Sequence, residues 1–339
     1  MAKSNNIETR YLETEEYSLW DTFVDQSKDG TIFHKTNWLR TFADWQHLKL
    51  CVAGCFKGTE LTGGMAFTWK KKFGIIPVMQ QPVKTPFFSP VIANSQTGYL
   101  SKIESQLNAT LNSLIDFLSS EFKLLQIQFP PSFSDIRTFL WKDFESSVHY
   151  TYLTAIQQLE DLISVYDPSV RRQIKKGGEQ NYSLYKDNSR EFIEAAWELE
   201  QKSFKRQQLD MQYATNEDFV SFIELLAEQE SAQTYTIKFE DRAIASQIVL
   251  LDNAKKSSYY WLAGVDNRYL STGLNQLLLH KILTDLQDRG YQLFDFVGAG
   301  TKTIAKYKST FNFPLVPMYS VRKAGTLVKF GLTVKKFIQ

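Results

Sequence analysis

The stretch that decides the fold is 267-NRYLSTGLNQLLLHKILTDLQDRGYQLFDFVGAGTKTIAKYKSTFN-312. It opens with a small polar turn, 267–273, which leads into an apolar helix that ends at Arg289-Gly290. Residues 291–296 then have the composition of a buried strand, and a glycine loop follows them before the Tyr307-Lys308 pair. Backbone amides and the helix dipole converge at a helix N-terminus, so such a turn favours anion binding.

The rest of the chain repeats this order of elements. In the first half we expect strands at 48–56 and 61–70, a helix at about 101–121 and a strand at 123–129. In the second half we expect strands at 234–239, 243–251 and 257–263, a helix at about 272–289 and a strand at 291–296. Between the halves lie a strand at 150–153 and a helix at about 158–166. A duplicated module explains this order better than one large sheet.

The length of 339 residues also favours two domains, because single cores rarely grow to this size. We therefore expect an α/β (α+β) chain in which each domain is a mixed, largely antiparallel sheet flanked by helices, with a cleft between the domains. The expected boundaries are 1–150 and 151–317, and the tail 318–339 is expected to join the first domain.

The composition excludes several classes of protein. The formal net charge of +2 is too small to indicate wholesale nucleic-acid binding. Cys51 and Cys55 lie in one apolar run and are interpreted as buried small hydrophobic residues, and the histidines lack the spacing of metal ligands, so we expect no metal. The polar N-terminus and the absence of a long apolar run favour a cytoplasmic protein.

Two clusters of cations are candidate phosphate contacts. The first follows Asp167-Pro168-Ser169, a helix-start signal in which we expect Ser169 to be the cap. At helical spacing its members share faces pairwise and form one basic patch: Arg171 with Lys175, and Arg172 with Lys176. The second cluster contains Arg206 and Gln207 at a helix end. The alternative for both clusters is a structural role, as a solvated face or as complements to a helix dipole.

The decisive stretch holds the candidate catalytic and donor-binding residues. Ser271, Thr272, Gly273 and Asn275 open a helix and are candidates for binding donor phosphates. Tyr307 is a candidate proton donor to a leaving group, and Lys308 a candidate partner for an anion or oxyanion. Alternatively, Tyr307 belongs to the core and Lys308 is exposed.

A carboxylate inside an apolar strand needs a partner or a role. Asp295 lies in such a strand and is a candidate general base for an amine nucleophile. Alternatively, backbone amides of the glycine loop satisfy Asp295. The basic C-terminus, from Val321-Arg322-Lys323 to Lys336, either contacts anionic lipid as an amphipathic helix or packs on its own protein.

These segments together resemble a known family, the FemAB-like branch of the GNAT acyltransferases. The resemblance extends from about Tyr17 to Phe313 and is carried by the order and spacing of several segments. They are 20-WDTFV-24, 33-FHKTNWL-39, 135-DIRTF-139, 150-YTY-152, 171-RRQIKK-176, 204-FKRQ-207, 294-FDF-296 and 307-YKSTF-311.

The resemblance implies two tandem GNAT-like domains, with the acyl donor on the second. It also implies that the basic helix contacts substrate phosphates and that the Tyr-Lys pair lines the active cleft. The chain departs from the family pattern in two places. It lacks the long helical arm of some tRNA-dependent members, and its phosphate loop is the degenerate 268-RYLSTG-273.

The sequence therefore predicts an N-acyltransferase. We expect it to move an acyl group from acyl-CoA, such as acetyl-CoA, to an amine on a phosphate-bearing acceptor, for example a nucleotide sugar, a lipid-linked sugar or another cell-envelope precursor. The donor carbonyl is expected to bind backbone amides of the strand 257–263. Two alternatives stay open: an aminoacyl-tRNA-dependent aminoacyltransferase acting on a peptidoglycan precursor, and a non-catalytic binding protein with the same fold.

Overall fold

The computed structural model describes residues 7–94, 99–206 and 215–325. The chain divides into two compact units, one made of residues up to His149 and from Pro317 onward, the other of Tyr150–Val316. The chain leaves the first unit within β7 (Glu145–Ala155) and returns to it within β13 (Leu315–Ala324).

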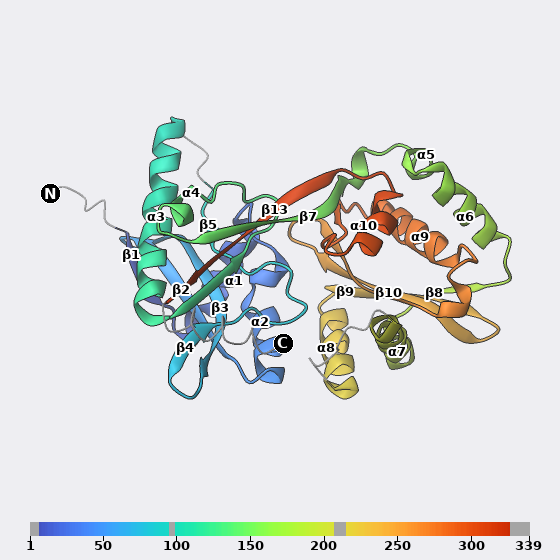
Figure 1. Ribbon diagram of the computed structural model, residues 1–339, viewed down its shortest axis with the longest axis horizontal. Helices are drawn as coiled ribbons and strands as arrows, with labels where there is room; N and C mark the ends of the chain where they lie inside the picture. The colour runs from blue at the N-terminus through green and yellow to red at the C-terminus, as the bar shows by residue number, and fades with distance from the viewer. Residues whose placement is uncertain (1–6, 95–98, 207–214, 326–339) are drawn as a thin grey trace, which may run out of the picture. The chain divides into compact units, whose positions relative to one another are not determined.

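The first unit is built on an antiparallel sheet in the order β1-β2-β3-β4 (Figure 1). These strands are β1 (Glu8–Tyr11), β2 (Lys49–Lys57), β3 (Glu60–Lys72) and β4 (Ile76–Met79), and β5 (Val91–Ile92) pairs with β3. A two-residue turn joins β2 to β3, and Gly58 supplies its positive φ of 64°. In addition, β6 (Leu124–Gln128) pairs with Ser320–Ala324 of β13.

Helices complete the first unit. They are α1 (Tyr17–Gln26), α2 (Thr36–Trp45), α3 (Leu100–Glu121) and the short α4 (Arg137–Leu140). In α3 the buried residues Leu111, Leu114, Ile115 and Leu118 recur at helical spacing, so one apolar stripe faces the core.

The second unit contains strands in the order β7-β12-β11-β10-β9-β8. The strands not yet bounded are β8 (Ser183–Lys186), β9 (Ala232–Phe239), β10 (Arg242–Asp252), β11 (Ser257–Val265) and β12 (Leu293–Asp295). The β11–β12 pair is parallel and the other pairs within this unit are antiparallel.

Helices cover both faces of the second sheet (Figure 1). One face carries α5 (Leu162–Val165), α6 (Pro168–Gly178), α9 (Leu274–Asp288) and α10 (Lys302–Ser309), and the other carries α7 (Arg190–Arg206) and α8 (Asn216–Glu228). The expected fold class, mixed sheets flanked by helices, is confirmed.

Several local predictions were wrong. The helix expected at 158–166 is a 3-10 turn, Ile156–Gln158, followed by the four-residue α5, because Asp161 caps a new helix start by accepting from the Ile163 amide. The cap of α6 is Asp167, whose Oδ1 accepts from the Ser169 amide at 2.7 Å, and not Ser169 itself.

One further expectation was wrong at the end of an element, and one of two alternatives for the basic C-terminus is not adopted at residues 321–323. The last strand of the decisive stretch is only Leu293–Asp295, because the backbone leaves the sheet after it. Residues 321–323 lie in β13 and not in a helix, while the rest of the basic tail, 326–339, lies outside the described residues.

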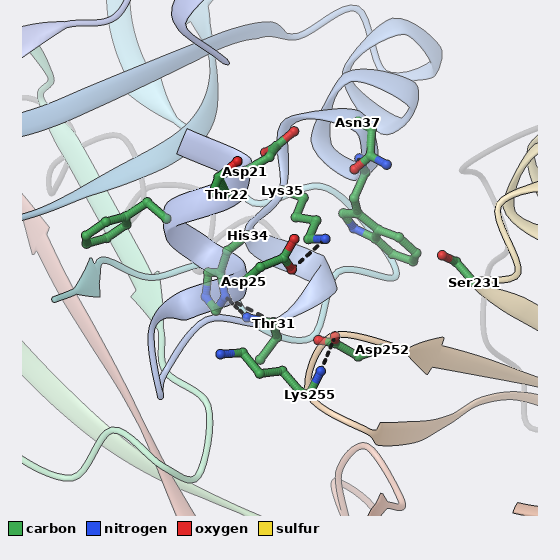
Figure 2. A network of polar contacts seen from close by, with 12 residues as sticks. Asp21, Thr22, Asp25, Thr31, His34, Lys35, Asn37, Ser231, Asp252 and Lys255 are labelled. Atoms are coloured by element: carbon green, nitrogen blue, oxygen red, sulfur yellow. Dashed lines mark hydrogen bonds and ion pairs between the residues drawn. The ribbon is translucent and has the colours of Figure 1, made fainter. Parts of the chain in front are cut away.

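The first unit contains a buried histidine, His34, in a polar cluster before α2 (Figure 2). Its Nδ1 accepts from the Thr31 amide at 3.1 Å, which leaves the proton on Nε2, 3.1 Å from Ser89 Oγ. The adjacent Lys35 pairs with Asp25 at 2.6 Å. Burial lowers the pKa of His34 from 6.5 to about 3.

This histidine predicts a specific loss of stability in acid. Between pH 6.5 and about 3 the unfolded chain binds a proton at His34 that the folded chain excludes, so the free energy of unfolding falls as the pH drops. The contribution to the free energy of unfolding is roughly 5 kcal/mol at its limit. Denaturant unfolding of wild type and His34→Asn from pH 7 to 4 measures this contribution. The free energy of unfolding of wild type minus that of His34→Asn should become smaller as the pH falls. The exposed His47→Gln control should keep the wild-type slope; equal slopes in all three proteins would contradict the prediction.

Candidate functional site

Two parallel strands of the second unit separate beside the candidate catalytic residues. Strand β11 pairs with β12 only from Ser257 to Tyr259, opposite 293–295, and then continues to Val265 after β12 has ended. The register of β11 against β10 shifts between Leu262 and Tyr260, so Trp261 is the extra residue of a β-bulge. Such bulges turn side chains and sharpen strand twist. The edge of β11 beyond Tyr259 therefore has no strand partner in β12, and we call this unpaired edge the opening.

The opening is kept by a tight turn of the chain after β12. Val297 and Gly298 adopt positive φ values of 54° and 92°, and this conformation is strained for a β-branched residue such as valine. Three buried side chains hold the turn. Asp295 Oδ1 accepts from the Val297 amide at 2.7 Å and from Thr151 Oγ1 at 2.5 Å, and Thr151 Oγ1 accepts from the Gly298 amide at 2.9 Å.

Lys308 closes the same turn from α10. Its ammonium donates to the carbonyl oxygens of Phe296 at 2.6 Å and Gly298 at 2.7 Å. We call Thr151, Asp295 and Lys308 the turn clasp. Lys308 is buried, with 7% of its surface exposed, so the alternative of an exposed lysine was wrong. Burial lowers the pKa of Lys308 to about 8, and the nearby Asp295 opposes this shift.

Asp295 is nearly inaccessible and its burial raises its pKa, while the hydrogen bonds from Thr151 and Val297 oppose the rise. Its contact with the Val297 amide is the one expected of a carboxylate satisfied by the loop. A role as general base stays a prediction.

Tyr307 lies at the opening with its hydroxyl held from two sides. Asn275 Nδ2 donates to Tyr307 Oη at 2.8 Å, and the hydroxyl of Tyr260 on β11 is hydrogen-bonded to it as well. Asn275 in turn receives a hydrogen bond from Gln247 Nε2 at 3.0 Å. Burial raises the pKa of Tyr307 well above its ordinary value, which keeps its proton in place at neutral pH.

The basic helix α6 packs directly on the turn that precedes α9. A Cβ on Gly273, which has a φ of 84°, would lie 2.0 Å from the Gln173 carbonyl oxygen, and a Cβ on Gly177 would lie 2.8 Å from the Gly273 carbonyl oxygen. The two backbones therefore touch. Lys176 adds a hydrogen bond from Nζ to the Ser271 carbonyl at 2.8 Å. The candidate phosphate contacts on α6 and on the α9 turn thus lie together.

This contact divides the four cations of α6 into two pairs. Gln173 and Gly177 face α9, and a helix turns 100° per residue. Lys176 consequently lies beside the turn and Arg172 lies one helical turn earlier on the same side of α6, while Arg171 and Lys175 point away from α9. All four are exposed.

The remaining predicted residues of the turn are placed as follows. Thr272 Oγ1 donates to the Tyr269 carbonyl at 2.7 Å and accepts from the Leu274 amide at 3.3 Å. Arg206, at the end of α7, donates to the Val265 carbonyl at 3.5 Å and to Asn267 Oδ1, so it reaches the same turn from another helix. Asn275 instead points to Gln247 and Tyr307. Gln207 lies outside the described residues.

A pocket of about 280 Å³ lies between α6, α9 and α10 and is lined in part by Gln173, Gln276, Lys306 and Tyr307. The buried Oε1 atoms of Gln173 and Gln276 have no hydrogen-bond partner in the described part of the chain. Sequence reasoning missed both glutamines, as well as Thr151, Tyr260 and Gln247. For Gln247 a signal existed, because it is a polar residue inside the apolar strand 244-IASQIVLL-251.

Within the described ranges, no group of three or more His, Cys, Asp or Glu side chains is arranged to hold a metal ion. A search of the same ranges found no helix long and apolar enough to cross a membrane.

Comparison with known proteins agrees with this geometry. Residues 168–309 match the family described as acetyltransferase (GNAT) domain. A search of curated proteins found no match.

Several solved structures have a similar fold over nearly the whole chain. FemX superposes with a TM-score of 0.69 at 12% identity, covering 92% of this chain and 96% of FemX. The C-terminal domain of a putative lysylphosphatidylglycerol synthetase from Agrobacterium fabrum gives 0.58 at 11%, covering 94% of each chain. A tandem GNAT protein from the clavulanic acid biosynthesis pathway gives 0.53 at 10%, covering 94% and 98%. Identities this low establish a shared fold alone. The expected resemblance is confirmed.

The backbone contact between α6 and α9 predicts opposite effects at adjacent glycines. Gly177→Ala should lower the free energy of unfolding by about 1–3 kcal/mol, because its Cβ meets the Gly273 backbone. The Cβ added in Gly178→Ala meets no atom within 4 Å. This variant should therefore raise the free energy of unfolding by about 1 kcal/mol through helix propensity. Chemical denaturation of the two variants measures both changes. A stabilised Gly177→Ala protein would show that the contact is not close.

Lys308 predicts a gain of stability in alkali. Between pH about 8 and 10.5 the folded chain has released the Lys308 proton and the unfolded chain retains it, so the free energy of unfolding rises with pH by roughly 3 kcal/mol in total. Lys308→Met lacks this pH-dependent contribution to the free energy of unfolding. Lys306→Met, at an exposed lysine on the same helix, is the matched control. Denaturant titrations of the three proteins at pH 7, 8, 9 and 10 test this. A wild-type-minus-Lys308→Met difference that stays constant with pH would contradict it.

Proposed function

We propose that this chain is a FemAB-like GNAT acyltransferase and that it transfers an acyl group from acyl-CoA to an amine on a phosphate-bearing acceptor. The observation that carries the proposal is the separation of β11 from β12, with the Tyr307 hydroxyl held at the opening. Acceptors in this class include nucleotide sugars and cell-envelope precursors.

The donor carbonyl would bind in the opening beside β11. Backbone amides of a strand that has lost its partner can donate to the developing oxyanion of the tetrahedral intermediate. Strand β11 lacks the β12 partner after Tyr259, and the turn clasp prevents the chain after β12 from covering it. Lys308 supports the site by fixing this turn, since its ammonium donates to the backbone carbonyls of Phe296 and Gly298.

Tyr307 would act as the general acid. The acceptor amine attacks the carbonyl carbon, the carbon–sulfur bond breaks, and the departing thiolate takes the Tyr307 proton. The proton released by the amine restores the tyrosine, so no net proton is consumed. A phenol whose pKa is raised by burial is protonated at neutral pH and suits this role.

The chemistry around the α9 turn favours a phosphate-bearing donor. Lys176 and Arg206 come from different helices and both contact the segment 265–271, and Arg172 lies on the same flank of α6 as Lys176. The adjacent pocket adds the two unpartnered amide oxygens of Gln173 and Gln276. Amide N–H groups, such as those of the pantetheine arm of coenzyme A, are suitable donors to such oxygens.

A second candidate is aminoacyl transfer from aminoacyl-tRNA. The likeness in fold to a putative lysylphosphatidylglycerol synthetase, whose name describes a lysyl group joined to a phospholipid, is compatible with an aminoacyl group as cargo and a lipid phosphate acceptor. The outward pair Arg171 and Lys175 would then contact the acceptor phosphate in either case. A non-catalytic binding protein would bind the acceptor without consuming any donor.

Calorimetry with coenzyme A and acetyl-CoA tests the donor. We expect the double variant Arg172→Ala/Lys176→Ala to bind about 10- to 100-fold more weakly than wild type, because charge-assisted hydrogen bonds to phosphate are lost. The Arg171→Ala/Lys175→Ala variant should bind coenzyme A nearly as wild type. Lys281→Ala, an exposed cation elsewhere on α9, is the control.

Gly273 is not a suitable probe of this site, because any side chain there collides with α6. Equal losses of affinity for coenzyme A in the two double variants would contradict the proposal that Arg172 and Lys176, rather than Arg171 and Lys175, bind the donor phosphates. No binding by wild type would exclude coenzyme A donors and direct the same variants to charged tRNA.

A further inference from the structure

Gln247 is the buried polar group that the site leaves unexplained. It lies in the middle of β10 with no exposed surface, and its Oε1 has no hydrogen-bond partner among the described residues. An unsatisfied buried amide oxygen costs about 1–3 kcal/mol, so an apolar residue of similar size would stabilise the core better. Its Nε2 donates to Asn275 Oδ1 at 3.0 Å.

That contact fixes the direction of a chain of hydrogen bonds. Because Gln247 donates to Asn275 Oδ1, the amide nitrogen of Asn275 must face Tyr307, and it donates to Tyr307 Oη at 2.8 Å. If Asn275 were reversed, its oxygen would face Tyr307 and would accept the phenolic proton.

We propose that Gln247 and Asn275 are positioning residues that leave the Tyr307 proton available to a leaving group. The proposal rests on the proposed function. Asn275 Nδ2 occupies one lone pair of Tyr307 Oη. In the proposed arrangement the Tyr260 hydroxyl, which is hydrogen-bonded to the same oxygen, donates to the other lone pair. The Tyr307 hydrogen is then directed to the substrate. Asn275, expected from the sequence to bind the donor, acts through Tyr307 instead.

Kinetics with two acyl donors test the proposal. The first donor is acetyl-CoA, whose alkyl thiolate needs a proton as it leaves, and the second is S-acetyl-5-thio-2-nitrobenzoate, whose aryl thiolate does not. UDP-glucosamine is the acceptor amine. With acetyl-CoA, we expect kcat to fall at least about 100-fold in Tyr307→Phe and about 10-fold in Gln247→Leu and Asn275→Leu. With the aryl donor, all three should approach wild type.

Two more variants sharpen the result. Asn275→Asp presents only acceptors to the Tyr307 hydroxyl, so it should lose at least as much activity with acetyl-CoA as Asn275→Leu does. Thr234→Val also removes a buried, unpartnered oxygen from the same sheet, on β9, and should match wild type with both donors. Equal losses of Gln247→Leu with both donors, or no loss with either, would overturn the proposal.

An activity-independent measurement separates this inference from the proposed function. In ¹⁵N-labelled protein the side-chain amide hydrogens of Asn275, identified by their loss in Asn275→Leu, should exchange with solvent at least about 10-fold faster in both Gln247→Leu and Tyr307→Phe. The rate in Thr234→Val should match that of wild type. If wild type turns over neither donor, the proposed function fails. In that case the exchange rate still tests whether Gln247 and Asn275 position Tyr307. An unchanged exchange rate in Gln247→Leu overturns that proposal.

Discussion

The site depends on one buried ammonium group, that of Lys308, between the carbonyl oxygens of Phe296 and Gly298. A lysine so far from water is costly, and among the described residues no other donor to those two carbonyls is found. Lys308 binds both sides of the turn at which the parallel pairing of β11 with β12 ends, and it ties α10 to the sheet. The preceding residue, Tyr307, is thereby brought beside Tyr260. The end of the strand pairing and the position of the Tyr307 hydroxyl are thus both linked to the turn that Lys308 holds.

Burial acts on the two neighbours in α10 in opposite directions. It destabilises the charged form of each group, so it lowers the pKa of Lys308 and raises that of Tyr307. The lysine has polar partners on the backbone, whereas the tyrosine has partners on the side chains of Asn275 and Tyr260. A structural cation and a protonated phenol therefore lie side by side in sequence with separate tasks.

The sequence predicted the elements whose signals are local. Alternating apolar residues and short turns gave the hairpins β2–β3 and β9–β10, and helical periodicity gave α3 and α9. It failed where a single polar side chain decided the outcome, as when Asp161 restarted a helix and Asp167 replaced Ser169 as a cap. Periodicity could not reveal features that depend on residues distant in sequence. These features are the burial of Lys308, the contacts of Thr151 and Gln247, and the division of the α6 cations.

The contact of Gly177 with Gly273 has a mechanical consequence. With no side chain between the two backbones, nothing there can change rotamer to absorb a displacement. A ligand that moves α6 along or away from α9 must therefore also move the turn at the start of α9. Occupancy of the outward cations and occupancy of the turn become thermodynamically linked, and each ligand must change the affinity of the other by the same factor. The affinities for two substrates bound on this unit would then be coupled through the backbone contact between α6 and α9 alone.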